Sequence, residues 1–200
     1  MTQEILTFDA DTHTYRIGDR IVPTVTQIIR EVLAPNEYAG VPLHALDRAA
    51  KRGRAVERMI ELDLAAELDT DSLHPELLPY WHGWQSFPDR AAWQNDPDWL
   101  SQGRVYSPVR HYAGTFDLWL PSAHALVDIK ATALVPSTVG IQTAAYADAM
   151  VPPEDGASIK RYCLHVTPTR CTLIPLTDKS DSADFLAALR VYNWRHRHDA

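Results

Sequence analysis

Two aspartates and one lysine between positions 113 and 132 are the residues best suited to catalysis. Asp117 stands among apolar neighbours in a predicted strand, and eleven positions later Asp128 lies near the end of a second apolar strand, two residues before Lys130. Alternate residues of a strand leave the same face of a sheet, so we expect the Asp128 carboxylate and the Lys130 ammonium to lie side by side. A buried carboxylate is unfavourable without a counter-charge or a metal ion. Two carboxylates and one amine leave an excess of negative charge that a divalent cation would neutralise.

This set of residues favours phosphodiester hydrolysis. Oxygen ligands with room for water suit Mg²⁺, and Mn²⁺ should substitute for it. The cation would polarise a phosphate oxygen, while Lys130 would orient or help deprotonate the attacking water and stabilise a phosphorane-like transition state. The alternative is a surface Asp-Lys pair with Asp117 facing solvent, because an Asp-x-Lys sequence is common by chance.

Four short motifs occur in order along the chain. They are RGRAVER at 52–58, AGTFD at 113–117, VDIK at 127–130 and QTAAY at 142–146. In this order they resemble the PD-(D/E)XK nuclease superfamily, in particular its RecB-like and phage exonuclease branch, and the segment 14–29 resembles the N-terminal block of such phage proteins. The resemblance implies an α/β, restriction-endonuclease-like fold with a mixed central β-sheet flanked by helices. It also implies a DNA exonuclease of phage or bacterial recombination or repair, with a recombinase, an annealing protein or a helicase as a possible partner.

The resemblance also implies roles for individual residues. Asp117 and Asp128 would be catalytic metal ligands, with Lys130 as the water-activating base and the Ile129 carbonyl as a further ligand. Glu57 would complete the metal shell from a helix, at a position where histidine is more common in RecB-like proteins. The alternative is a solvated Glu57 paired with a neighbouring arginine, Arg54 or Arg58.

Further matched or nearby residues could contact the substrate. Gln142 and Tyr146 share one helix face, and by resemblance they would orient Lys130 and contact the DNA backbone; the alternative is a buried polar pair. Gln102 stands where relatives often carry an acid, which could weaken a second metal site. The basic residues of the long helix could grip phosphates or form a solvated face; they are Arg48, Lys51, Arg52 and Arg54.

The predicted elements place these residues in one domain covering 1–200. Residues 1–35 should form a β meander followed by a helix, 42–98 a helical elaboration, and 99–200 the catalytic core. The core pattern is three strands (99–107, 110–120, 125–129), a helix (137–150), two strands (159–166, 171–176) and a final helix (182–197). In the elaboration we expect a long helix between 42 and 68 and a tryptophan-rich helical stretch over 75–93.

Two features of the helical elaboration carry expectations of their own. Gly53 interrupts the long helix and suggests a close approach by another backbone or a ligand. Trp81, Trp84 and Trp93 should pack in the core rather than form a base-stacking platform.

Composition limits the remaining functional classes. The 200 residues carry a formal net charge of −7, which argues mildly against nucleic acid, although the bases cluster. No apolar run approaches a membrane span and the N-terminus does not resemble a signal peptide, so we expect a cytoplasmic protein without a membrane role. The two cysteines should be reduced core residues. A phosphate-binding glycine loop and a G-x-S-x-G motif are both absent from the sequence, which removes P-loop ATPases and serine hydrolases.

Two functions of other classes remain open at this stage. A catalytically inactive DNA-binding or complex-assembly module of the same fold would explain the acidic net charge and Gln102. A partner-binding scaffold would instead expose the tryptophan-rich helices as an interface.

Overall fold

A five-stranded mixed sheet forms the centre of the computed structural model, which describes residues 5–150 and 159–198. The strands, in spatial order, are β4 (Leu100–Ser107), β5 (Tyr112–Leu120), β6 (Ala125–Lys130), β7 (Lys160–Val166) and β8 (Cys171–Pro175). All neighbouring pairs are antiparallel except β6 and β7, which are parallel. Parallel neighbours need a long crossover, and the helix α5 (Val139–Met150) lies within it. The prediction of an α/β chain with a mixed central sheet flanked by helices is therefore confirmed.

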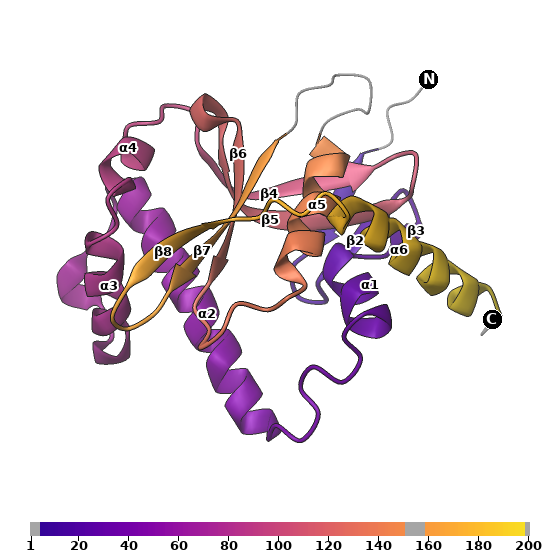
Figure 1. Cartoon of the computed structure of the whole chain (residues 1–200), viewed down its shortest axis with the longest axis horizontal. Coiled ribbons are helices and arrows are strands. Elements are labelled where there is room, and N and C mark those ends of the chain that lie inside the picture. The colour runs from indigo at the N-terminus through magenta and orange to yellow at the C-terminus, as the bar shows by residue number, and fades with distance from the viewer. Residues whose placement is uncertain (1–4, 151–158, 199–200) are drawn as a thin grey trace.

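Two groups of helices cover the sheet, each over its own hydrophobic core. On one side lie α2 (Leu43–Leu64), α3 (Leu78–Gln85) and α4 (Arg90–Gln94), and on the other lie α1 (Val25–Val32), α5 and α6 (Asp181–His198), as Figure 1 shows. The first core takes Ile60 and Trp84 against Val127, and the second takes Ile28 and Phe185 against Leu126. The adjacent residues of β6 thus serve opposite cores, as the alternation of a strand requires.

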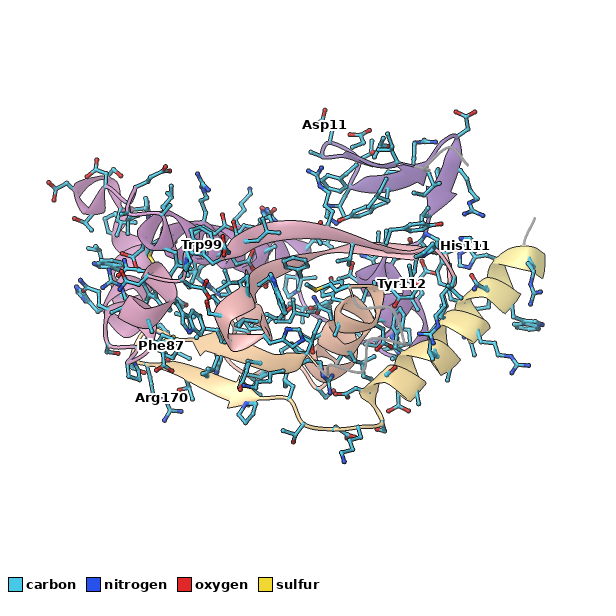
Figure 2. The ribbon with its side chains drawn as sticks, turned by 90° about the horizontal axis from the view of Figure 1, so that it is seen from above. Asp11, Phe87, Trp99, His111, Tyr112 and Arg170 are labelled. Atoms are coloured by element: carbon cyan, nitrogen blue, oxygen red, sulfur yellow. The ribbon has the colours of Figure 1, made fainter. Side chains whose placement is uncertain are left out.

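The N-terminal residues form a small separate sheet. Its strands β1 (Leu6–Asp9), β2 (Thr14–Ile17) and β3 (Arg20–Val22) make an antiparallel meander, in agreement with the sequence prediction. In Figure 2 the meander, with Asp11 at its outer turn, lies above the long β4 and β5 strands. Tyr15 anchors it, because the ring is fully buried and the hydroxyl hydrogen-bonds to Thr115 of β5.

The helical elaboration differs from the prediction in three places. The long helix ends at Leu64 instead of continuing to 68, since Ala66 adopts a left-handed conformation with φ of 57°. The stretch 75–93 contains two short helices, because Pro88 lies in the turn between α3 and α4 and cannot donate to a helical ladder. The expectation that another backbone approaches Gly53 is wrong, because a Cβ atom placed there meets no atom of the described residues within 4 Å, while a ligand at this position stays a prediction.

Two sequence predictions about the core are confirmed. Trp81, Trp84 and Trp93 are buried, and the Trp84 indole donates to the Asp63 carboxylate at 2.8 Å. Cys163 and Cys171 are buried free thiols, and burial raises the pKa of each to about 12, so both stay protonated at neutral pH. In the part of the chain described here, helices long and apolar enough to span a membrane are absent.

Candidate active site

Asp117 lies where the β5 and β6 strands separate. Their ladder pairs Leu118 with Val127, and the next pair in that register would be Asp117 and Asp128. Instead of this pair, Oδ2 of Asp117 accepts the Ile129 backbone N–H at 2.7 Å. The side chain thus takes the place of a ladder carbonyl, and it brings the two carboxylate-bearing residues opposite each other.

The neighbouring strand is also irregular at this point. The β4–β5 ladder omits the pair of Gln102 with Asp117, and Gln102 has a φ of 51°. Phe116 packs in the α1, α5 and α6 core, whereas Leu118 packs in the α2 and α3 core. Residues two apart normally share a face, so the alternation of β5 breaks at Asp117. Such irregularities often occur next to functional sites, where they redirect a side chain.

Asp128 is the most deeply buried member of this site. Its relative exposure is 2%, and the ammonium nitrogen of Lys130 lies 2.7 Å from its Oδ2, as the spacing of two residues predicts. This contact is an ion pair without hydrogen-bond geometry, and neither carboxylate oxygen of Asp128 accepts a hydrogen bond from a described residue. Leaving a buried acceptor unsatisfied costs about 1–3 kcal/mol, and more for a charged group. Oδ1, which has no polar partner among the described residues, therefore fits a position for a bound cation.

Glu57 approaches the same charges from α2. Burial raises the pKa of its carboxyl, the Lys130 charge lowers it, and the Asp128 charge raises it further. Glu57 is therefore close enough to Lys130 and Asp128 to interact with both electrostatically. The Arg58 guanidinium contacts Glu61 at 3.3 Å, so the ion pair of Arg58 is made with Glu61. The structure therefore brings Glu57 to the aspartates although it lies sixty residues before Asp117.

The electrostatics of the cluster favour an additional positive charge. Burial raises the pKa of Asp117 well above its usual range, and Asp128 raises it further. Burial also raises the pKa of Asp128. For Lys130, burial lowers the pKa but the two aspartates raise it more, so the lysine stays protonated at neutral pH. When all three carboxylates are ionised, they leave two negative charges in excess around one ammonium, which equals the charge of one divalent cation.

Side chains alone do not supply enough ligands to complete the coordination shell of such a cation. Within 5–150 and 159–198, three His, Cys, Asp or Glu side chains do not come together in a group arranged to hold a metal. Asp117 and Asp128 are therefore the side-chain donors that fit best, with the Ile129 carbonyl as a backbone ligand and water completing the shell. Mg²⁺ usually keeps several waters and binds through one or two carboxylates.

Comparisons with known proteins do not identify the chain. It matches no protein-family model and no curated protein. The case for its chemistry therefore rests on the residues themselves.

Tyr146 and Gln142 lie beside the carboxylates. Tyr146 is buried, and Nε2 of Gln142 donates to its hydroxyl at 3.3 Å. Burial raises the pKa of Tyr146 and the Asp128 charge raises it further, so the hydroxyl remains a neutral donor. Gln142 and Tyr146 can therefore form a polar pair in the core and still belong to the active site, because the buried Tyr146 hydroxyl interacts electrostatically with Asp128.

Gly114 makes room for the Tyr146 ring. A Cβ atom at Gly114 would lie 2.5 Å from Cε1 of Tyr146, closer than carbon atoms can approach. We expect Gly114→Ala to destabilise the fold by about 1–3 kcal/mol, as overpacked cores are, and to displace Tyr146. Gly53→Ala is the matched control, because the new methyl meets open space in a helix and should stabilise by up to about 1 kcal/mol. Thermal unfolding should move in opposite directions for the two variants; equal shifts would contradict this account of Gly114.

Most of the predicted basic residues of α2 line a hollow apart from the carboxylates. Lys51 pairs with Asp47 at 2.8 Å. Lys51 and Arg52 line a hollow of about 670 Å³ that also contains Arg48. Arg54 is one turn from Glu57 and lowers the pKa of that carboxyl. Of the predicted DNA contacts on this helix, Arg54 is therefore the one that the structure brings to the site.

Sequence reasoning missed two kinds of residue. The first is Glu61, a buried acid one turn after Glu57, whose Oε1 accepts from Gln102 at 3.0 Å. Its helical spacing from Glu57 was the available signal. The second is a set of residues around a cavity of about 300 Å³ next to Lys130 and Gln142, namely Thr26, Arg30, Tyr38 and Thr138. Nothing in their sequence spacing connects them.

Proposed function

We propose that this chain is a divalent-metal-dependent nuclease of the PD-(D/E)XK type that hydrolyses the phosphodiester bonds of DNA. The observation that carries the proposal is the buried Asp128 carboxylate, whose Oδ2 pairs with Lys130, whose Oδ1 has no partner among the described residues, and which lies beside Asp117 and Glu57. A structural ion pair would need one acid for one base, whereas this cluster has acids in excess. Perturbed titratable groups of this kind are concentrated at functional sites.

The arrangement of elements supports the same proposal. The strands β4, β5 and β6 form a meander, α5 crosses over to the parallel strand β7, and β8 closes the sheet. This order is compatible with a restriction-endonuclease-like core, which the order of the four sequence motifs also suggests. The motif AGTFD ends at Asp117 in β5, VDIK ends β6, and QTAAY lies within α5.

In the proposed mechanism the protein binds the cation, orients the attacking water and stabilises the charge that develops on the phosphate. Asp117 and Asp128 would hold the cation, with the Ile129 carbonyl and Glu57 completing the donors. When bound, Mg²⁺ or Mn²⁺ supplies the charge that polarises the phosphodiester and makes a water molecule more acidic. The Lys130 ammonium lies beside that position, where it orients the attacking water and stabilises the negative charge that develops on the phosphate. The two aspartate charges raise the pKa of Lys130 and burial lowers it, so neutralised carboxylates would favour the uncharged amine, the form in which Lys130 could act as a base.

We place the activity in DNA recombination or repair, in the cytoplasm, as an exonuclease working with a recombinase, an annealing protein or a helicase. The resemblance of the motifs to the RecB-like and phage exonuclease branch supports this setting. An inactive module of the same fold would bind DNA without needing the excess of acids around Lys130.

The experiment is digestion of end-labelled linear DNA and closed circular DNA by the purified chain. We expect Mg²⁺ or Mn²⁺ to support degradation of the linear form alone, and a chelator to abolish it. Asp128→Asn is the control, because it removes a proposed ligand while keeping the shape of the side chain. Absence of cleavage with either metal, or full activity in Asp128→Asn, would refute the nuclease; digestion of the circle would refute the exonuclease.

A further inference from the structure

The cavity beside Lys130 opens between two connections of the chain. One connection, 33–42, leads from α1 to α2, and the other, 131–138, leads from β6 to α5 (Figure 1). The cavity measures about 300 Å³, and Tyr38 of the first connection and Thr138 of the second both line it. That volume is at the lower end of the range of ligand pockets. Any molecule that reaches Lys130 through it passes between these two segments.

Exposed apolar side chains are concentrated on both of these segments. Tyr38 is 53% exposed and Val41 42% exposed on one side, and Leu134 is 82% exposed on the other. Leu43, at the start of α2, is 83% exposed. Single exposed apolar residues are ordinary. Of these four, Tyr38 is the one that lines the cavity, so it offers the apolar surface that a molecule bound there would contact.

The charges around the cavity suit an anionic chain. Arg30 and Lys130 line it with one acid, Glu37. Burial raises the pKa of the Tyr38 hydroxyl, the Glu37 charge raises it further, and the Lys130 charge lowers it, so the aromatic ring lies near the catalytic ammonium. Cations with an aromatic ring beside them are the combination that single-strand binding sites use: the cations follow the phosphates and the ring stacks on a base.

We propose that this cavity binds one unpaired DNA strand, with the Tyr38 ring stacked on a base beside the phosphate that is cleaved. The inference rests on the proposed function, because it takes Lys130 as the catalytic lysine. A base in a duplex is already stacked and paired, so Tyr38 can reach a base face only in a single strand or after unpairing. The substrate class is therefore single-stranded DNA or an unpaired end, and a blunt duplex is the poorer substrate.

The test is binding of a short fluorescent single strand and of its blunt duplex, followed by anisotropy in the presence of a chelator. We expect the wild type to bind the single strand more tightly than the duplex. Tyr38→Ala should weaken single-strand binding by about five- to a hundredfold, the range found for loss of one stacked base. Tyr38→Phe should restore it, because the ring and not the hydroxyl makes the contact. Val109→Ala is the matched control, since Val109 is 81% exposed on the β4–β5 turn, outside the residues that line this cavity.

Three results would overturn the inference. They are equal or tighter binding of the duplex, single-strand affinity that Tyr38→Ala leaves unchanged, and failure of the wild type to bind either DNA. Failure of the nuclease proposal is visible separately, because binding in chelator requires no cleavage. Single-strand binding that depends on Tyr38 without any digestion would refute the nuclease and keep this site. Digestion of blunt duplexes that is indifferent to Tyr38 would keep the nuclease and refute this site.

Discussion

Lys130→Met should lower the turnover number on DNA by about a hundred- to ten-thousand-fold, the range typical of a lost proton-transfer group. Methionine keeps the length and unbranched stem of lysine but carries no charge. The loss should fall on turnover, because the ammonium next to Asp128 acts on charge that develops during the reaction. Affinity for a single strand, measured in chelator, should fall by a smaller factor than turnover, since one of the two cations of the cavity is lost but Arg30 and Tyr38 remain in place.

Lys160→Met is the matched control for this prediction. Lys160 begins β7, is exposed, and pairs in register with Ala125 at the opposite end of β6 from Lys130. Its replacement removes one positive charge from the same sheet and should leave turnover unchanged. Single-turnover digestion at saturating Mg²⁺ is the measurement. Wild-type rates in Lys130→Met, or equal losses in both variants, would show that Lys130 takes no part in the reaction.

The two strands that carry Asp117, Asp128 and Lys130 could be predicted because the evidence for them is local. The alternation of a strand is sufficient to place Asp128 and Lys130 on one face, and the structure has their charged atoms 2.7 Å apart. The apolar runs around Asp117 and Asp128 likewise predicted two strands with buried acids. In each case the deciding information lies within a few residues of the site.

Other features of the site depend on how distant segments pack. The approach of Asp117 to Asp128 depends on the register of β5 and β6 and on the hydrogen bond from Ile129 to the Asp117 side chain, which no local pattern determines. The approach of Glu57 depends on where α2 crosses the sheet, and the resemblance alone suggested it. The cavity around Tyr38 forms where the connections 33–42 and 131–138 come together. The sequence of either connection alone therefore gave no indication of a binding site.

The error at Gly53 has a simpler physical cause. A glycine in a helix indicates a weakened helix, and a close neighbour is one reason for it among several. Here no atom of residues 5–150 and 159–198 lies within 4 Å of a Cβ placed at Gly53, whereas Gly83, Gly103, Gly114 and Gly140 all face atoms that a Cβ would strike. Sequence shows that a glycine is present, but only packing shows what it accommodates.

The second large effect concerns the stability of the fold: replacing an acid of the cluster should lower activity but raise stability. Asp117, Asp128 and Glu57 have raised pKa values in the cation-free protein, so the folded state holds protons that the unfolded chain releases near pH 4. Between that pH and the raised pKa values the folded state binds more protons, and the free energy of unfolding therefore falls as the pH rises. We expect chelated protein to lose thermal stability from pH 5 to pH 8, and Mg²⁺ to restore more of it at pH 8 than at pH 5.

Asp117→Asn should weaken this pH dependence while abolishing cleavage. The amide cannot ionise, so it removes one of the three clustered charges, yet its oxygen can still accept the Ile129 N–H that Asp117 accepts. In chelator at pH 8 the variant should melt at least about 2 °C above the wild type, the smallest shift expected from 1 kcal/mol in a chain of this size. Asp19→Asn, which removes a carboxylate from an exposed turn, should leave the pH dependence unchanged. The measurement is calorimetry of the wild type and both variants at pH 5 and pH 8. A lower melting temperature for Asp117→Asn at pH 8 would mean that Asp117 stabilises the fold. The excess of clustered acids would then need no cation to explain it.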